Sequence, residues 1–310
     1  MYISSKVFFM NVLVLGANGQ LGRCIKDAES KHNSSFLNFV YKSREECDIT
    51  SESSILDAIK QNSIDAIVNC AAFVNVSAAE EDEQKKAYEV NTLGPMMLAN
   101  ICEKQHVLLI HISTDFVFDG MKGSTYKEND KCNPLNVYGM SKFLGEKAIT
   151  SLMNGNYYII RTSWLFSKYC NNSFKKMVEY ITAGENLYGT TDEIGKPTSA
   201  KDLADFIIWL LVYHSTSCFS NIIHFCNAGV ASRYDVAYEI AKYFGKTENL
   251  KETKMTPPSF YNPKRPKMNV LENTVDEKIY KVRHWREALK EYLDEYCKEY
   301  RIDVEGKTDA

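Results

Sequence analysis

Residues 11–22 read NVLVLGANGQLG and place Gly16, Gly19 and Gly22 directly after a short apolar run. The run predicts a buried strand, and the spacing of the residues after it predicts an amphipathic helix. Glycines at such a turn let the backbone approach a phosphate group, while the N-terminus of the helix attracts the anion. The stretch therefore predicts a dinucleotide-binding loop, with a plain strand-to-helix turn as the alternative.

The same rhythm continues through the first half of the chain. Further apolar runs lie at 36–41, 66–69, 108–113 and 158–161. They alternate with amphipathic segments near 20–30, 51–61, 83–104 and 138–150. Strand and helix in alternation predict a doubly wound parallel sheet of the α/β class, which binds its ligand at the carboxyl ends of the strands.

The rhythm changes in the second half. The pattern predicts helices at 173–183, 201–213, 234–244 and 285–299, a strand at 222–226 and a proline-rich loop at 256–266. We expect two domains. Residues 10–170 form an NAD(P)-binding domain to which segments near 188–228 return, and 171–187 with 229–310 form a smaller, mainly helical substrate domain.

Composition excludes several classes of protein. The 310 residues are 45% hydrophobic and 25% charged with a net charge of -3, which is typical of a folded protein and gives no general attraction to nucleic acid or anionic lipid. Nine scattered cysteines without a CxxC pair indicate reduced thiols in the cytoplasm. The apolar run at 206–213 is too short to span a membrane, and no export signal is evident. Translation could start at Met1 or Met10.

The end of the second expected strand bears on the choice of cofactor. The residues there are Tyr41, Lys42, Ser43 and Arg44, and no acid precedes Glu45. Basic side chains at this place favour the 2′-phosphate of NADPH, although NADH stays open and an exposed turn is the alternative. A little later, Asp48 and Ile49 are placed to flank the adenine.

A tyrosine and a lysine share one helix face in NPLNVYGMSKFLGEKA, where Tyr138 and Lys142 are four residues apart. A cationic amine stabilises the phenolate, so the phenol can act as an acid or base nearer to neutral pH. Ser113 and Thr114 follow the strand at 108–113, where a hydroxyl can polarise a carbonyl group. We expect these side chains to share one cleft with the glycine loop.

The order of these motifs resembles a known superfamily. GANGQLG with its GxxGxxG spacing, ISTDFVFDG, NPLNVYGMSKFLGEKA and RTSWLF are similar to the extended short-chain dehydrogenases/reductases, and within them to the dTDP-4-dehydrorhamnose reductases. The resemblance covers nearly the whole chain from Met10. It implies NAD(P)H-dependent reduction of the 4-keto group of a nucleotide sugar, dTDP-4-dehydro-L-rhamnose to dTDP-L-rhamnose, for cell-surface polysaccharide.

The resemblance also implies roles for individual residues. Thr114, Tyr138 and Lys142 would form the catalytic set, with Tyr138 as proton donor and Lys142 on the nicotinamide ribose. The cofactor would lie along Gly16, Asn18, Gly19, Gln20, Leu21, Lys42, Arg44, Asp48, Ile49, Asn69, Ala71, Ala72, Tyr138 and Lys142. The substrate would contact Ser113, Thr114, Trp164 and Arg265. Core packing is the alternative for Trp164, and an unliganded loop cation is the alternative for Arg265.

Several positions depart from the family's pattern. Ser77 and Ala78 replace an aspartate and a lysine beside the expected substrate pocket, and Arg233 replaces a tryptophan. Lys201 stands where some members carry a glutamate at a metal-bridged dimer contact, so we expect no metal. Two alternatives therefore stay open beside the reductase: a reductase or epimerase of another nucleotide sugar, and a non-catalytic NADP-binding subunit similar to the beta subunit of methionine adenosyltransferase. A homodimer is also left open.

Overall fold

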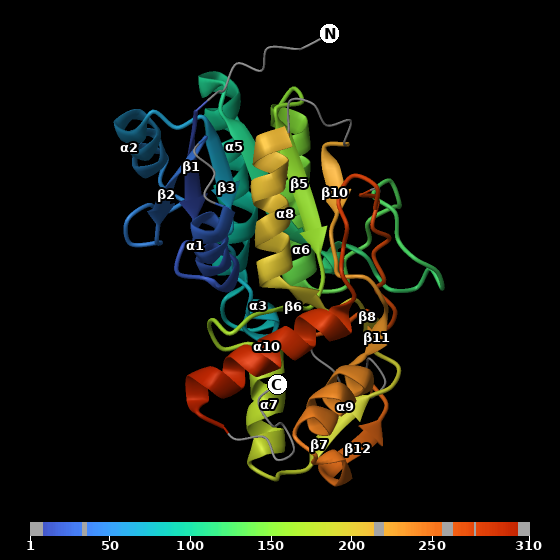
Figure 1. The fold of residues 1–310 in the computed structure, drawn as a ribbon. Helices are drawn as coiled ribbons and strands as arrows, with labels where there is room; N and C mark the ends of the chain where they lie inside the picture. The colour runs from blue at the N-terminus through green and yellow to red at the C-terminus, as the bar shows by residue number, and fades with distance from the viewer. Residues whose placement is uncertain (1–8, 33–35, 214–219, 256–262, 276, 303–310) are drawn as a thin grey trace.

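A six-stranded sheet forms the centre of the protein in this computed structural model, which describes residues 9–32, 36–213, 220–255, 263–275 and 277–302 (Figure 1). The strand order is β10-β5-β4-β3-β1-β2, and every neighbouring pair is parallel. The bounds are β1 Met10–Leu15, β2 Leu37–Lys42, β3 Ala66–Asn69, β4 Leu108–Thr114, β5 Tyr157–Thr162 and β10 Ile222–His224. The predicted doubly wound α/β fold is confirmed, whereas residues 1–8 and 256–262, which bear on the start site and the proline-rich loop, lie outside the described residues.

Helices cover both faces of this sheet. Figure 1 shows α1 (Gln20–His32) and α8 (Ala200–Tyr213) in front of the strands, with α5 (Gly94–Gln105) and α6 (Val137–Leu152) behind them. α2 (Glu52–Asn62) packs on the same face as α5. The helix expected at 83–104 is α4 (Gln84–Tyr88), a π-helical turn at Glu89–Leu93 and α5 in succession.

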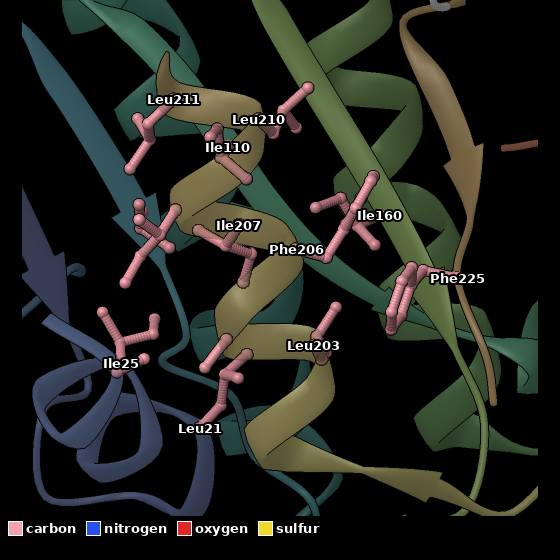
Figure 2. Packing of buried hydrophobic residues seen from close by; sticks show 14 of the residues in the cluster. Leu21, Ile25, Ile110, Ile160, Leu203, Phe206, Ile207, Leu210, Leu211 and Phe225 are labelled. Carbon is pink, nitrogen blue, oxygen red and sulfur yellow. The ribbon is translucent and has the colours of Figure 1, made fainter. Parts of the chain in front are cut away.

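α8 is the helix with the strongest apolar character, and the sheet explains it. Leu203, Phe206, Ile207 and Leu210 of α8 pack against α1 and against Ile160 of the sheet (Figure 2). Burial of these side chains between two layers stabilises the fold. This burial accounts for the uncharged apolar run at 206–213, which is too short to span a bilayer. Within the described residues, no helix is long and apolar enough to cross a membrane.

Beyond the carboxyl ends of the strands lies a smaller group of elements (Figure 1). It contains α7 (Ser173–Thr182), α9 (Arg233–Tyr243) and α10 (Trp285–Tyr300), which pack around a core that includes Phe174 and Trp285. Three two-stranded pairs complete it: β6 (Leu165–Phe166) with β9 (Thr198–Ser199), β7 (Leu187–Thr190) with β12 (Leu250–Thr253), and β8 (Ile194–Gly195) with β11 (Ala231–Ser232). Such short strands leave too few residues for a periodic pattern. The expected domain limits stay a prediction.

One close contact sets the position of α6. Asn136 caps this helix, and its side-chain oxygen accepts a hydrogen bond of 2.8 Å from the amide of Gly139. A Cβ atom at Gly139 would clash with the carbonyl oxygen of Phe116, so a larger residue would push the helix away from the end of β4. The glycine therefore keeps the first turn of α6 close to the edge where the ligand site is expected.

Candidate active site

A continuous cleft runs along the carboxyl ends of the strands. It consists of two adjoining hollows that share Gly19, Cys70 and Ala72. The first hollow is also lined by Gly16, Asn18, Arg44, Asp48, Ile49 and Ala71. The second is also lined by Gln20, Leu21, Ser113, Thr114, Asp115, Tyr138, Lys142, Trp164 and Arg233. Most of the side chains expected at the site from the sequence therefore border one cleft.

The glycine loop fits the phosphates of a dinucleotide. Gly16 has a φ of +74°, and a Cβ atom there would lie 2.7 Å from the backbone nitrogen of Ala71. The amide of Gly19 donates a 2.9 Å hydrogen bond to the carbonyl of Gly16, which closes the turn before α1. The first turn of α1 contains no acidic residue, so its amides and dipole can receive an anion without repulsion.

The two basic residues after β2 differ in their surroundings. The side chain of Arg44 is 63% exposed at the mouth of the first hollow, with its Nε 3.5 Å from the carboxylate of Asp48. Lys42 ends β2, and its carbonyl accepts a 3.1 Å hydrogen bond from the amide of Ala17. Lys42 is not among the described residues that line the cleft. Of the two residues, Arg44 thus borders the hollow, and the role of either side chain toward a phosphate on the adenosine ribose stays a prediction.

Tyr138 and Thr114 meet in the second hollow. Thr114 is the last residue of β4, and Tyr138 lies in the first turn of α6 with its ring edge-on to Phe116 at 5.7 Å. Burial raises the pKa of the Tyr138 phenol to about 12, and the Thr114 hydroxyl acts in the opposite direction. The sequence predicts a phenol that Lys142 brings nearer to neutrality. The structure differs, because burial dominates and the ammonium group is hydrogen-bonded elsewhere.

Lys142 belongs to a buried chain of hydrogen bonds. Its Nζ donates to the carbonyl of Ile112 at 2.6 Å and lies 3.2 Å from His111 Nε2. His111 Nδ1 lies 3.1 Å from the side-chain nitrogen of Asn69, whose Oδ1 accepts from the amide of Ala71. Burial lowers the pKa of Lys142 to about 8 and holds the pKa of His111 well below its usual value. Asn69 is itself fully buried and is not among the described residues that line the cleft; its link to the cleft is the hydrogen bond with the amide of Ala71, which does line it.

Asp115 is a site residue that sequence reasoning missed. It is 2% exposed and accepts hydrogen bonds from the hydroxyls of Thr114 and Ser163. Burial raises the pKa of its carboxyl to about 7, and the charge of Arg233 acts in the opposite direction. The sequence does contain a signal that could have identified Asp115. It is an acidic residue directly after a buried strand, next to Thr114, which was already assigned to the site. His111 was missed for a similar reason, as a polar residue inside an apolar strand.

Ser113 is placed differently from the expectation. Its Oγ donates a hydrogen bond to Glu146, which forms a buried ion pair of 2.6 Å with Arg161. Although Ser113 borders the cleft, its hydroxyl is used inside the protein, because an unpaired buried carboxylate oxygen would be costly. Thr114, one residue later on the opposite face of the strand, is the hydroxyl that meets Tyr138.

Trp164 and Arg265 were both assigned to the substrate. Trp164 borders the second hollow, whereas the half-buried Arg265 is not among the described residues that line it. The segment with Arg265 contacts the start of α6, where the carbonyl of Lys264 accepts from the side chain of Asn136. That Arg265 faces the diphosphate stays a prediction.

Lys201 lies away from the cleft. Its ammonium group pairs with Glu291 and Glu295 of α10, so these carboxylates already have a cation. No group of three or more metal-ligating His, Cys, Asp or Glu side chains occurs within the described ranges. That the protein needs no metal stays a prediction.

Comparison with known proteins identifies relatives of this chain. The RmlD substrate binding domain family matches residues 10–298. The spore coat polysaccharide biosynthesis protein SpsK of Bacillus subtilis is 33% identical, with 92% of this chain and 97% of the relative covered. The dTDP-4-dehydrorhamnose reductase of Mycolicibacterium smegmatis is 30% identical over 92% of this chain and 85% of the relative.

A solved structure gives the same result. The dTDP-4-dehydrorhamnose reductase of Bacillus anthracis, crystallised in complex with NADP, superposes with a TM-score of 0.83 at 30% identity. The match covers 93% of this chain and 100% of that chain. A TM-score this high over nearly the full length means that the two chains share the same overall fold. The chain therefore belongs to the RmlD substrate binding domain family, within the extended short-chain dehydrogenases/reductases.

Proposed function

We propose that this protein uses NADPH to reduce the 4-keto group of a nucleotide sugar, dTDP-4-dehydro-L-rhamnose, to the alcohol of dTDP-L-rhamnose. The observation that carries the proposal is the meeting of Thr114, Tyr138 and Lys142 in one cleft with the glycine loop. Family membership and the NADP complex of the relative support the same reaction. The sugar product would serve the synthesis of cell-surface polysaccharide.

The residues of the cleft divide the work of the reaction. Bound NADPH supplies the hydride that adds to the carbonyl carbon. Tyr138 gives its phenolic proton to the carbonyl oxygen, so that the ketone becomes an alcohol. A pKa of about 12 keeps this phenol protonated at neutral pH, which suits a proton donor. Thr114 orients the carbonyl beside the phenol, and Lys142 holds the ribose of the cofactor.

The two ends of the cleft support the choice of ligands. Gly16, Gly19 and the start of α1 suit the pyrophosphate, and the exposed guanidinium of Arg44 suits the 2′-phosphate of NADPH. Ile49, Ala71 and Ala72 provide an apolar wall for the adenine side. Because NADPH and nucleotide sugars are cytoplasmic metabolites, we place the reaction in the cytoplasm. The mass of the protein in solution, measured by light scattering, would show whether it forms a homodimer.

The proposal is tested by the loss of NADPH absorbance when purified protein is mixed with dTDP-4-dehydro-L-rhamnose generated in place. We expect turnover that falls at least about 100-fold in Tyr138→Phe, because this variant lacks the proton but keeps the ring. Turnover of a different 4-keto nucleotide sugar alone would reassign the substrate. NADPH binding without turnover of any nucleotide sugar would contradict the proposal and favour the regulatory alternative.

A further inference from the structure

Arg233 borders the catalytic hollow with an unusual set of contacts. It is the first residue of α9, and its backbone amide donates a 3.1 Å hydrogen bond to the carbonyl of Glu193. Its side-chain Nε donates to the Glu193 carboxylate at 3.0 Å. The guanidinium carbon lies 3.6 Å from the centre of the Trp164 ring, which is a close cation–π contact. These contacts fix the position and the plane of the guanidinium group.

One nitrogen of this fixed group has no hydrogen-bond partner among the residues that the structure describes. Arg233 Nη1 is buried, and the described residues offer it no hydrogen bond. Buried donors on charged groups are nearly always paired, because removing such a group from water without a new partner is costly. Arg233 lines the same hollow as Thr114 and Tyr138. The unused N–H group therefore belongs to a residue that borders this hollow.

Trp164 positions Arg233 at this place. Its φ of +45° is unusual for a bulky residue, and strained backbone of this kind often occurs at functional sites. The indole also packs closely on Gly195, where a Cβ atom would lie 2.6 Å from a ring carbon. With the guanidinium over its face, the indole supports Arg233 at the border of the hollow.

Local charge limits what this nitrogen can bind. Glu193 forms an ion pair with Arg233, and the two side chains are 13% and 15% exposed, so the positive charge is already balanced. Asp115 adds a further carboxyl group to the same hollow. A second anion such as a phosphate would meet little net attraction here. A neutral oxygen, such as a hydroxyl group of the sugar ring, can accept the hydrogen bond without this cost.

We propose that Arg233 is a specificity-determining residue whose Nη1 donates a hydrogen bond to a ring hydroxyl of the sugar held beside Tyr138. This inference rests on the proposed function and adds the contact that selects the sugar. A site built to pair with a hydroxyl rejects an analogue that lacks it, because the buried donor then stays unpaired. The protein is thus expected to discriminate against analogues of this sugar that lack the contacted hydroxyl at C2 or C3.

The test compares Arg233→Met and Arg233→Lys with the unaltered protein on dTDP-4-dehydro-L-rhamnose and on analogues that lack the hydroxyl at C2 or at C3. We expect each variant to lose about 10- to 100-fold in kcat/KM on the full substrate. Lysine keeps the charge beside Glu193 but lacks a second nitrogen to reach the sugar. On one of the deoxy analogues the unaltered protein should fall by a similar factor, and the variants should lose little further.

Arg286 provides a matched control. It stacks on Trp285 at 4.5 Å and pairs with Glu239 at 2.6 Å, but it lies outside the cleft. Arg286→Met should leave kcat/KM unchanged. NADPH binding by each Arg233 variant, followed by fluorescence, should match the unaltered protein and so show that the fold is intact.

Three results would overturn the inference. Equal losses on full and deoxy substrates would mean that Arg233 is merely structural. Unchanged kcat/KM in Arg233→Met would mean that the residue does not contact the sugar. A loss of kcat/KM in Arg233→Met that occurs only with a 4-keto nucleotide sugar bearing a carboxylate, assayed in parallel, would mean that Nη1 binds an anion. Lack of turnover by the unaltered protein would instead remove the proposed function, and this inference with it.

Discussion

Lys142 Nζ lies 3.2 Å from Nε2 of His111. The two groups belong to a chain of hydrogen bonds, and a backbone amide at its other end determines which group donates and which accepts. The amide of Ala71 can only donate, so Asn69 Oδ1 accepts from it and Asn69 Nδ2 faces His111 Nδ1. His111 therefore accepts at Nδ1 and carries its hydrogen on Nε2, pointing at Lys142. The N–H group of His111 that points at Lys142 disfavours the charged ammonium form. Burial acts in the same direction and lowers the pKa of Lys142 to about 8.

The first prediction concerns the pH dependence of reduction. Because the proposed role of Lys142 is to hold the cofactor as a cation, kcat/KM should fall as pH rises through about 8. Glu146 and Cys70 also face this amine and favour its charged form. His111→Gln can present an oxygen to Lys142, so the alkaline limb should move to higher pH.

His224 supplies the control for that measurement. It is also fully buried and hydrogen-bonded through Nδ1, to the carbonyl of Tyr126, but it does not line the cleft. His224→Gln should leave the alkaline limb in place. Identical limbs in His111→Gln and the unaltered protein would show that His111 does not influence Lys142.

The second prediction concerns Asp115 and stability. Its folded-state pKa of about 7 lies above the unfolded value, so its contribution to stability is present below about pH 4 and is lost as pH rises through 7. Asp115→Asn should therefore gain stability relative to the unaltered protein between pH 5 and pH 8, by about 1–3 kcal/mol. Urea unfolding at the two pH values measures the change. A constant difference between the two proteins would contradict a raised pKa.

The third prediction concerns the ion pair behind Ser113. Glu146 and Arg161 are each 3% exposed and lie 2.6 Å apart. Arg161→Met should lower the free energy of unfolding by about 3–5 kcal/mol, because it leaves a buried carboxylate without its cation. The double variant with Glu146→Gln should recover part of this loss. Additive losses in urea unfolding would argue against coupling between the two side chains.

The fourth prediction separates the two basic residues after β2. Arg44→Ala should raise KM for NADPH by about 10-fold while leaving KM for NADH nearly unchanged, since NADH lacks the 2′-phosphate. Lys42→Ala is the matched control and should have little effect, because its side chain is not among the described residues lining the cleft. Steady-state rates with both cofactors measure the preference. Loss of NADPH preference in Lys42→Ala alone would reverse the assignment.

The main helices and the sheet could be predicted from local patterns. Uninterrupted apolar runs such as 11–15 and 108–113 became central strands because both faces of the sheet are covered. The short strands β6 to β9 could not be predicted, since they lack the apolar run that marked the equally short β3 and β10. The π-helical turn at Glu89–Leu93 also left no distinct mark in the helical pattern.

By itself, the sequence determined the α/β fold, the glycine loop and the shared helix face of Tyr138 and Lys142, because each depends on residues a few positions apart. The tertiary structure alone decided which polar groups meet. Asn69 and His111 are 42 residues apart, and His111 and Lys142 are 31 apart. The stacking of Arg233 on Trp164 likewise joins α9 to the segment after β5. Burial and charge at these contacts come from packing between distant segments, which no local pattern records.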